Sequence, residues 1–326
     1  MTIGAFNALM LLLLALGGVA GVSIGSAHVA WPFTAPSDQV IVWLIRVPRV
    51  LVGATVGAGL ATAGAVMQGL FRNPLAEPGL LGVGPGAVLG AIAVFVSGWA
   101  GHMAVALPIG AVLSSLLVLG LVYAAAATRG VVPITHLLLI GIAAGSLCTA
   151  LSSLLIALNA TDWQSAQEIV FWMMGGVDAR SWLHVWLSAP FVVIGILVVT
   201  WKARELDLLA MGEERAASLG VDVESSKWLF ITTAALLTGV SVAVAGLLGF
   251  VGLVVPNAVR VVVGPRHRTL CPASALAGAA FVVACDLVAR TAHPPIEIRL
   301  GIVTALIGSP VLILMLSRRL RLRGAR

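Results

Sequence analysis

The chain has 326 residues, of which 60% are hydrophobic and only 10% are charged, and its mean hydropathy is +1.08. Because a soluble globular domain carries about 25% charged residues, this composition excludes a soluble protein with a water-exposed surface of this size. The formal net charge of +6 would suit a nucleic-acid partner, but the positions of the basic residues, given below, assign that charge to membrane topology.

Long apolar stretches with few charges recur along the chain, and most of them reach the roughly 20 residues that a helix needs to cross a bilayer. They are residues 8–22, 50–70, 79–97, 103–127, 137–158, 182–201, 228–254, 270–289 and 300–317. Lipid offers no partner to a backbone N–H or C=O group, so each stretch is expected to be a helix. The sequence therefore predicts an all-α polytopic membrane protein, with residues 1–326 forming one transmembrane domain.

Residues 246–264 decide how many crossings there are. Gly246, Gly249, Gly252 and Pro256 crowd this segment, which predicts a break and a separate short span after a crossing at 228–245. The count is then about ten transmembrane helices. A broken helix inside a membrane usually borders a cavity or pore, although a kinked core helix without a transport role is the alternative.

The first apolar segment has no Lys or Arg before it and no clear small-x-small cleavage site, so we expect a retained helix and not a signal peptide. Cys148, Cys271 and Cys285 show neither the spacing of metal ligands nor that of a disulfide framework. No metal site is predicted.

The basic residues are distributed asymmetrically. With both termini in the cytoplasm and ten crossings, thirteen of the 19 Lys and Arg residues fall inside. Five fall outside, namely Arg46, Arg49, Arg180, Arg290 and Arg299. This bias follows the positive-inside rule and predicts a multi-pass protein of the bacterial inner membrane.

Small residues recur along 53–69, where Gly53, Gly57 and Gly64 alternate with alanines. Such small-xxx-small patterns let helix backbones approach closely in lipid. The pattern predicts a tightly packed bundle and carries no information about a substrate.

The longest polar segment, residues 202–227, is expected to face the cytoplasm. Gly212 and Gly220 predict the ends of two short helices within it. A plain connector needs only a few residues, so the segment is interpreted as a docking surface for a soluble partner. An amphipathic helix lying at the membrane surface is the alternative.

Catalytic patterns are missing from the sequence. Neither lysine, Lys202 or Lys227, belongs to a G-x-x-x-x-G-K phosphate loop, and no G-x-S-x-G occurs. The chain is therefore not expected to be an enzyme, and any ATP would be bound by another chain. No run of carboxylates crosses the spans, which disfavours a secondary carrier. Asp286 and Arg290 stand at i and i+4 and can pair on one helix face.

Arg46 and Arg49 open the second predicted span at its outer end. Arginines at a helix end commonly extend to the membrane surface. Together with Arg290 and Arg299 they would instead form a cationic rim that binds carboxylates of an external protein. Both interpretations stay open at this point.

Several motifs resemble the FecCD-type permease family, which imports vitamin B12, ferric siderophores and haem. The first is R-V-P-R followed by G-A-V-M-Q-G-L-F-R-N-P-L-A-E-P-G-L-L-G-V, within residues 46–83. The others are F-W-M-M-G-G at 171–176, L-A-M-G-E-E-R-A-A-S-L-G-V at 209–221, G-F-V-G-L-V-V-P-N-A-V-R at 249–260 and G-I-V-T-A-L-I-G-S-P at 301–310. They extend over nearly the whole chain in the family's order.

The resemblance implies the fold of a type II ABC importer permease that works as a homodimer with two cytoplasmic ATPase subunits and a periplasmic binding protein. It implies no cofactor on this chain, with ATP and Mg²⁺ held by the ATPase. By position it assigns docking of the binding protein to Arg46, Arg49 and Arg290. It assigns the cytoplasmic gate to Asn73, Leu75, Ile134 and Thr135. Coupling to the ATPase is assigned to Leu209, Gly212, Glu213, Glu214, Arg215, Leu219 and Gly220.

The same resemblance places a short helix near the outer mouth at 167–175. The chain departs from the family at Glu297-Ile298-Arg299, where an arginine replaces the usual proline. Residues 176–182 resemble the haem branch slightly more than the others, and Arg180 would offer a cation to a propionate. Haem is therefore the expected cargo, with a ferric siderophore or vitamin B12 as the alternatives.

Overall fold

The computed structural model describes residues 2–24, 36–103, 105–127, 132–159, 163–293 and 296–324. Its elements, in chain order, are α1 (Ile3–Ser23), α2 (Pro36–Val40), η1 (Ile41–Arg46), α3 (Val47–Leu70), η2 (Pro78–Leu81), α4 (Val83–Val96), η3 (Trp99–Gly101), α5 (Ala106–Ala126), α6 (Ile134–Leu158), α7 (Trp163–Met173), α8 (Trp182–Trp201), α9 (Ala203–Ala210), α10 (Glu213–Ser218), α11 (Val223–Ala245), α12 (Val251–Val263), α13 (His267–Thr291) and α14 (Leu300–Gly324).

The helices match the predicted number of crossings. Seven of the described segments are long and apolar enough to span a bilayer, and shorter apolar helices cover Val83–Val96, Val251–Val263 and Leu300–Met315. The prediction of an all-α bundle with about ten transmembrane helices is confirmed. The remaining short helices, α7, α9 and α10, lie in the connections between spans.

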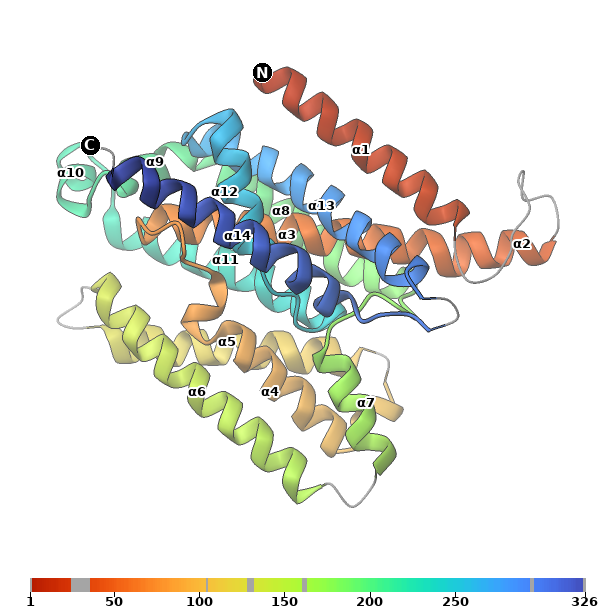
Figure 1. Cartoon of the computed structure of the whole chain (residues 1–326). Helices are drawn as coiled ribbons and strands as arrows, with labels where there is room; N and C mark the ends of the chain where they lie inside the picture. Colours follow the sequence, from red (N-terminus) through yellow and green to blue (C-terminus); the bar gives the residue numbers. More distant parts are fainter. Residues whose placement is uncertain are drawn as a thin grey trace.

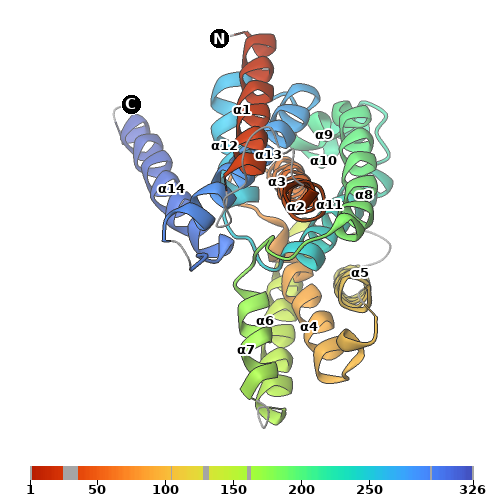
Figure 2. The ribbon, with the colours of Figure 1, turned by 90° about the vertical axis from the view of Figure 1, so that its right-hand side faces the viewer.

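Helix α3 forms the centre of the bundle. Seen almost along its axis in Figure 2, it is surrounded by α13, α12, α8 and α11, each of which contacts it. Its apolar window is 72% buried, whereas that of α1 is only 6% buried. Helices α4, α5 and α6 pack on one another beside this group, and α11 contacts both α4 and α5 (Figure 1).

Glycines bring α3 into backbone contact with its neighbours, as the small-residue pattern predicted. A Cβ atom on Gly57 would collide with the carbonyl of Gly278 in α13, and one on Gly64 would collide with the carbonyl of Gly252 in α12. Lipid supplies no hydrophobic force between helices, so close approach of this kind is what lets van der Waals attraction hold them together.

The break predicted after the crossing at 228–245 is confirmed. Helix α11 ends at Ala245, and α12 begins at Val251 after a segment in which Gly246 has a φ of 67° and Phe250 a φ of 68°. Pro256 lacks an N–H group and cannot pair with the carbonyl of Gly252. The side-chain amide of Gln68 donates to that carbonyl instead, at 3.1 Å, which fixes the short helix to α3.

These contacts predict that an added methyl group at Gly57 destabilises the bundle, although alanine favours helix more than glycine does. Gly57→Ala should lower the thermal midpoint of the purified protein in detergent, because overpacking typically costs about 1–3 kcal/mol. Gly120→Ala on α5 is the matched control, since a Cβ there has no atom within 4 Å. An equal midpoint for both variants would contradict this account of the packing.

Candidate functional site

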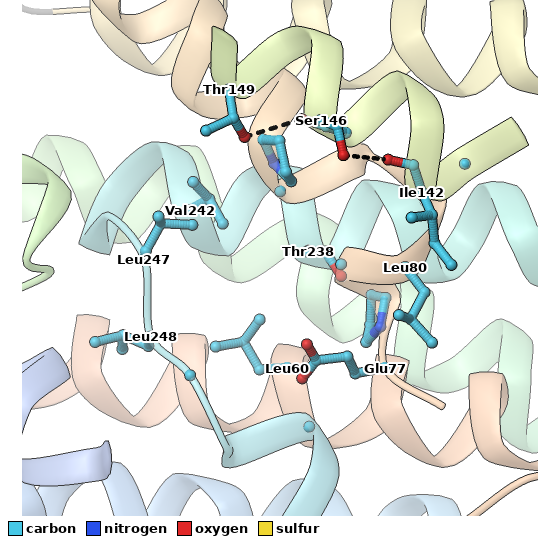
Figure 3. A pocket seen from close by; sticks show the side chains of 18 of the residues that line it. Leu60, Glu77, Leu80, Ile142, Ser146, Thr149, Thr238, Val242, Leu247 and Leu248 are labelled. Carbon is cyan, nitrogen blue, oxygen red and sulfur yellow. Dashed lines mark hydrogen bonds between the residues drawn. The ribbon is translucent and has the colours of Figure 1, made fainter. Parts of the chain in front are cut away.

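A cavity of about 800 Å³ lies between the broken segment 246–250 and the helices α4 and α6. Figure 3 shows Leu247 and Leu248 on one side and Ile142, Ser146 and Thr149 of α6 on the other. The prediction that the broken helix borders a cavity is therefore confirmed. This volume is within the range of pockets that accept organic ligands.

The wall of the cavity is mostly apolar and carries little charge. Its polar side chains are Glu77 and the hydroxyl groups of Ser146, Thr149, Ser153 and Thr238. None of the described residues that line it is a Lys, Arg or His. The wall thus has no cation with which to retain an anionic ligand.

Two of the hydroxyl groups on α6 are already used as donors within their own helix. Ser146 donates to the carbonyl of Ile142 at 3.0 Å, and Thr149 donates to that of Gly145 at 2.9 Å (Figure 3). They therefore offer acceptor lone pairs to the cavity. A surface of this kind makes weak contacts, which suits passage of a ligand better than tight binding.

A close approach between η2 and α6 shapes this wall. A Cβ on Gly141 would lie 2.6 Å from the carbonyl oxygen of Leu80, so only glycine fits there. Gly82 has a φ of 75°, which is the left-handed conformation that glycine adopts at little cost. These two glycines let the chain turn from η2 into α4 directly beside α6.

At the end of the bundle that is expected to face outward, Arg49 pairs with two carboxylates. Its guanidinium donates to Asp286 at 2.8 Å and to Glu297 at 2.9 Å. Asp286 also lies 3.2 Å from Arg290 on the next turn of α13, so the predicted i,i+4 pair is confirmed. The side chain of Arg49 is 12% exposed and that of Glu297 is 32% exposed.

The other two predicted docking arginines bind the end of α1. Arg46 donates to the carbonyls of Val22 and Ser23, both at 2.8 Å, and Arg290 donates to that of Gly21 at 2.8 Å. Cations are favoured at a helix C-terminus, where carbonyl groups are left unpaired. Both arginines are only 4% exposed. The structure thus reveals an internal role that the sequence pattern did not indicate, and docking by Arg46, Arg49 and Arg290 stays a prediction.

Arg299, which stands where the family has proline, has partners of its own. It donates to Asp178 at 2.8 Å and its guanidinium lies 4.6 Å from the ring centre of Phe171. Burial by itself raises the pKa of Asp178, but the ion pair with Arg299 outweighs burial and the net pKa lies below the usual range. The substitution therefore joins the start of α14 to the loop after α7.

The short helix α7 covers Trp163–Met173 and so begins and ends earlier than the predicted 167–175. The chain turns sharply directly after it, because Gly175 has a φ of 70°. Arg180 follows this turn, and its buried Nε atom has no hydrogen-bond partner.

The predicted gate residues lie at those ends of two spans that are expected to face the cytoplasm. Asn73 and Leu75 are in the segment between α3 and η2, where the Asn73 side chain accepts a hydrogen bond from the Leu75 amide at 2.9 Å. Ile134 and Thr135 are the first residues of α6. No hydrogen bond joins the two pairs among the described residues, and their role as a gate stays a prediction.

Residues 202–227 form two short helices, as the glycine positions predicted. Gly212 precedes α10 with a φ of 124°, and Gly220 follows it with a φ of 84°. Met211 and Leu219 are 53% and 63% exposed, so the segment presents apolar side chains to the outside. Leu209 is 2% exposed and packs inward, so it supports this surface from below.

Helix α9 is held to the bundle by polar side chains. Asp207 lies 2.7 Å from Nδ1 of His267 and accepts its backbone N–H, while Glu205 accepts a hydrogen bond from Ser226 at 2.9 Å. Burial raises the pKa of Asp207, but the hydrogen bonds from His267 outweigh it and the net pKa is lowered. The carboxylate is therefore charged at neutral pH, which keeps α9 fixed to α13.

Comparison with known proteins agrees with this architecture. A family model described as the FecCD transport family matches residues 7–318. The chain is 42% identical over 312 residues to the cobalamin import system permease protein BtuC of Halobacterium salinarum, covering 91% of this chain and 82% of that one. It is 39% identical to the vitamin B12 import system permease protein BtuC of Shigella boydii, covering 97% and 94%.

A solved structure is also similar over the whole length. It is that of a metal-chelate type ABC transporter in an inward-facing conformation, with 31% identity and a TM-score of 0.89, covering 97% of this chain and 99% of that one. The ten apolar helices of the described part of the chain and relatives of this kind identify a multi-pass inner-membrane protein. The chain belongs to the FecCD transport family.

Proposed function

We propose that this chain is the membrane-spanning subunit through which an ATP-driven importer passes a cobalamin-like corrinoid into the cytoplasm. The observation that carries the proposal is the cavity of about 800 Å³ beside the broken α11–α12 segment, with no cation among the described residues of its wall. Broken helices that border a cavity are typical of substrate pathways in transporters.

The charge of the cavity wall favours one class of cargo over the others. A corrinoid presents mainly amide groups, which bind weakly to the hydroxyl acceptors of the wall, whereas haem carries two propionates that favour cations. Two relatives are named for cobalamin or vitamin B12 import, which supports the corrinoid. Haem, favoured by residues 176–182 in the sequence, and a ferric siderophore are the rival cargoes.

The partners follow from the surfaces. One copy leaves apolar side chains of α6 exposed, with Leu147 at 60% and Leu158 at 70%. We propose that a second copy covers this side and completes the pathway as a homodimer. Separate ATPase subunits, which hold ATP and Mg²⁺, would bind the surface of α9 and α10. A periplasmic binding protein would deliver the cargo at the outer end.

Cargo is tested in proteoliposomes that contain the permease, its ATPase and the cognate binding protein. ATP should drive accumulation of cobalamin, with no uptake of haem or a ferric siderophore. Arg180→Ala should change the cobalamin rate less than about twofold, because no carboxylate of the cargo needs that cation. Uptake of haem alone, slowed by the Arg180→Ala change, would reject the corrinoid and keep the family.

Coupling is tested on α10. Glu214 and Arg215 are exposed, so Glu214→Ala with Arg215→Ala should weaken co-purification with the ATPase, since each change removes a charged surface contact. Adding Glu213→Ala should abolish transport while the chain stays in the membrane. Normal assembly and transport by the triple variant would show that residues 202–227 are only a connector.

Docking is tested through the competition for Arg49. Glu297→Gln removes one of the two carboxylates that pair with Arg49 inside this chain. Arg49 is then freer to bind a carboxylate of the binding protein, so this variant should associate more strongly, whereas Arg49→Ala should associate more weakly. Exposed ion pairs contribute about 0.2–1 kcal/mol, so each change should be up to about fivefold, and wild-type association should weaken as ionic strength rises. Arg49→Glu should weaken it further.

Reversing the matching acid of the binding protein to Lys should recover part of the loss caused by Arg49→Glu. The thermal midpoint of each variant serves as the control, because Arg49 also pairs with Asp286 inside the bundle. An affinity that responds to neither salt nor these substitutions would leave Arg49 with its internal role alone.

A further inference from the structure

Lys227, in the second turn of α11, is a buried charge that the cavity and the docking surfaces leave unexplained. Its side chain is 1% exposed. The ammonium lies 2.6 Å from Glu224 and 3.1 Å from Glu213, and it donates to the carbonyl of Val132 at 2.8 Å. An ammonium has three donors, so all three are used. Such pairing is what allows a charge to be buried.

The partners of Lys227 belong to separate parts of the chain. Glu213 is the first residue of α10, in the proposed ATPase surface, and Val132 precedes Ile134, the first residue of α6 and of the predicted gate. In Figure 1, α10 and the first turn of α6 lie toward the same end of the bundle. One ammonium therefore joins the helix that would receive the ATPase to the segment that leads into the gate.

The first two turns of α11 contact both the segment before α6 and the last turn of α5. Glu224 accepts a hydrogen bond from the amide of Val132 at 3.3 Å. On the other side, Tyr123 near the end of α5 packs edge-to-face against Trp228, with 4.6 Å between ring centres. The last turn of α5 and the segment before α6 are thus both joined to the first two turns of α11.

Helices α9 and α10 differ in what they are bonded to. Asp207 fixes α9 to α13, which packs closely on α3 in the centre of the bundle. Among the described residues, the side-chain hydrogen bonds and ion pairs of α10 to other segments run through Glu213 to Lys227. Helix α10 also packs against α9, with Ala216 buried between them and the bundle, but α9 is itself fixed to α13. The direct polar link from α10 to α11 and the segment before α6 is therefore Lys227.

We propose that Lys227 is the positioning residue that transmits the movement of α10 to the segment before α6 and so sets the state of the cytoplasmic gate. This inference rests on the proposed function, in which an ATPase binds α9 and α10, and on the predicted gate at the start of α6. A side chain that fills the same space without a charge would drop the contacts to Glu213 and Val132 together, and the two segments would move independently.

The test uses the full permease with its ATPase in lipid nanodiscs and needs no cargo. His136→Cys, exposed on the first turn of α6, is the reporter, and its rate of modification by a maleimide is measured without nucleotide and with ATP plus vanadate. The three native cysteines are buried, so the parent protein gives the background. In the His136→Cys protein that retains Lys227, ATP plus vanadate should change the rate of maleimide modification several-fold.

Lys227→Met should reduce that change to less than twofold while ATP hydrolysis continues, and Lys227→Arg should restore most of it. Glu213→Gln, whose side chain is 33% exposed and tolerates substitution, should weaken the response in a complex that still co-purifies with the ATPase. Lys202→Met is the matched control, because Lys202 pairs with Glu205 on the adjoining turn and should keep the response.

A full nucleotide response in both Lys227→Met and Glu213→Gln would overturn the proposal. A different result would overturn the proposed function as well: the reporter in the otherwise unchanged chain would not respond to nucleotide, although the ATPase is bound. The two failures are thus told apart by the protein that retains Lys227.

Discussion

The close approach of α3 to its neighbours is the constraint on which the rest of the structure depends. Lipid gives helices no hydrophobic reason to associate, so the backbones meet through glycines, at Gly57 with Gly278 and at Gly64 with Gly252. The second contact, together with the Gln68 hydrogen bond, fixes the short helix α12. Because α12 is fixed, the unwound segment before it stays beside the cavity.

Charge is concentrated at the two ends of the bundle, and Glu77 is the one ionisable side chain on the described wall of the cavity. At the outer end Arg49, Asp286 and Arg290 join α3 to α13, and at the cytoplasmic end Lys227 and Glu213 join α11 to α10. Under the proposed function, a cavity wall without cations would bind a passing cargo weakly and so allow its release.

Two arginines that were predicted to dock a second protein instead make contacts inside this chain. Arg46 and Arg290 bind the carbonyls that end α1, a helix whose window is only 6% buried. Helix α1 packs against α13, and these polar contacts add a second attachment at the end of the helix. The ion pair of Arg299 with Asp178 likewise shows why an arginine is accommodated where the family has proline.

Much of this protein follows from local pattern. The spans, the break at Gly246 and the two short helices bounded by Gly212 and Gly220 were predicted correctly, because apolar length and glycine position act within a few residues of the chain. The partners of Arg46 and Arg299 and the bond from Lys227 to Val132 were not predictable, since each of these contacts joins segments far apart in sequence. An arginine at a helix end gives the same sequence pattern whether it contacts a second protein or the carbonyls of α1. Only the packing of the helices determines which of the two contacts it makes.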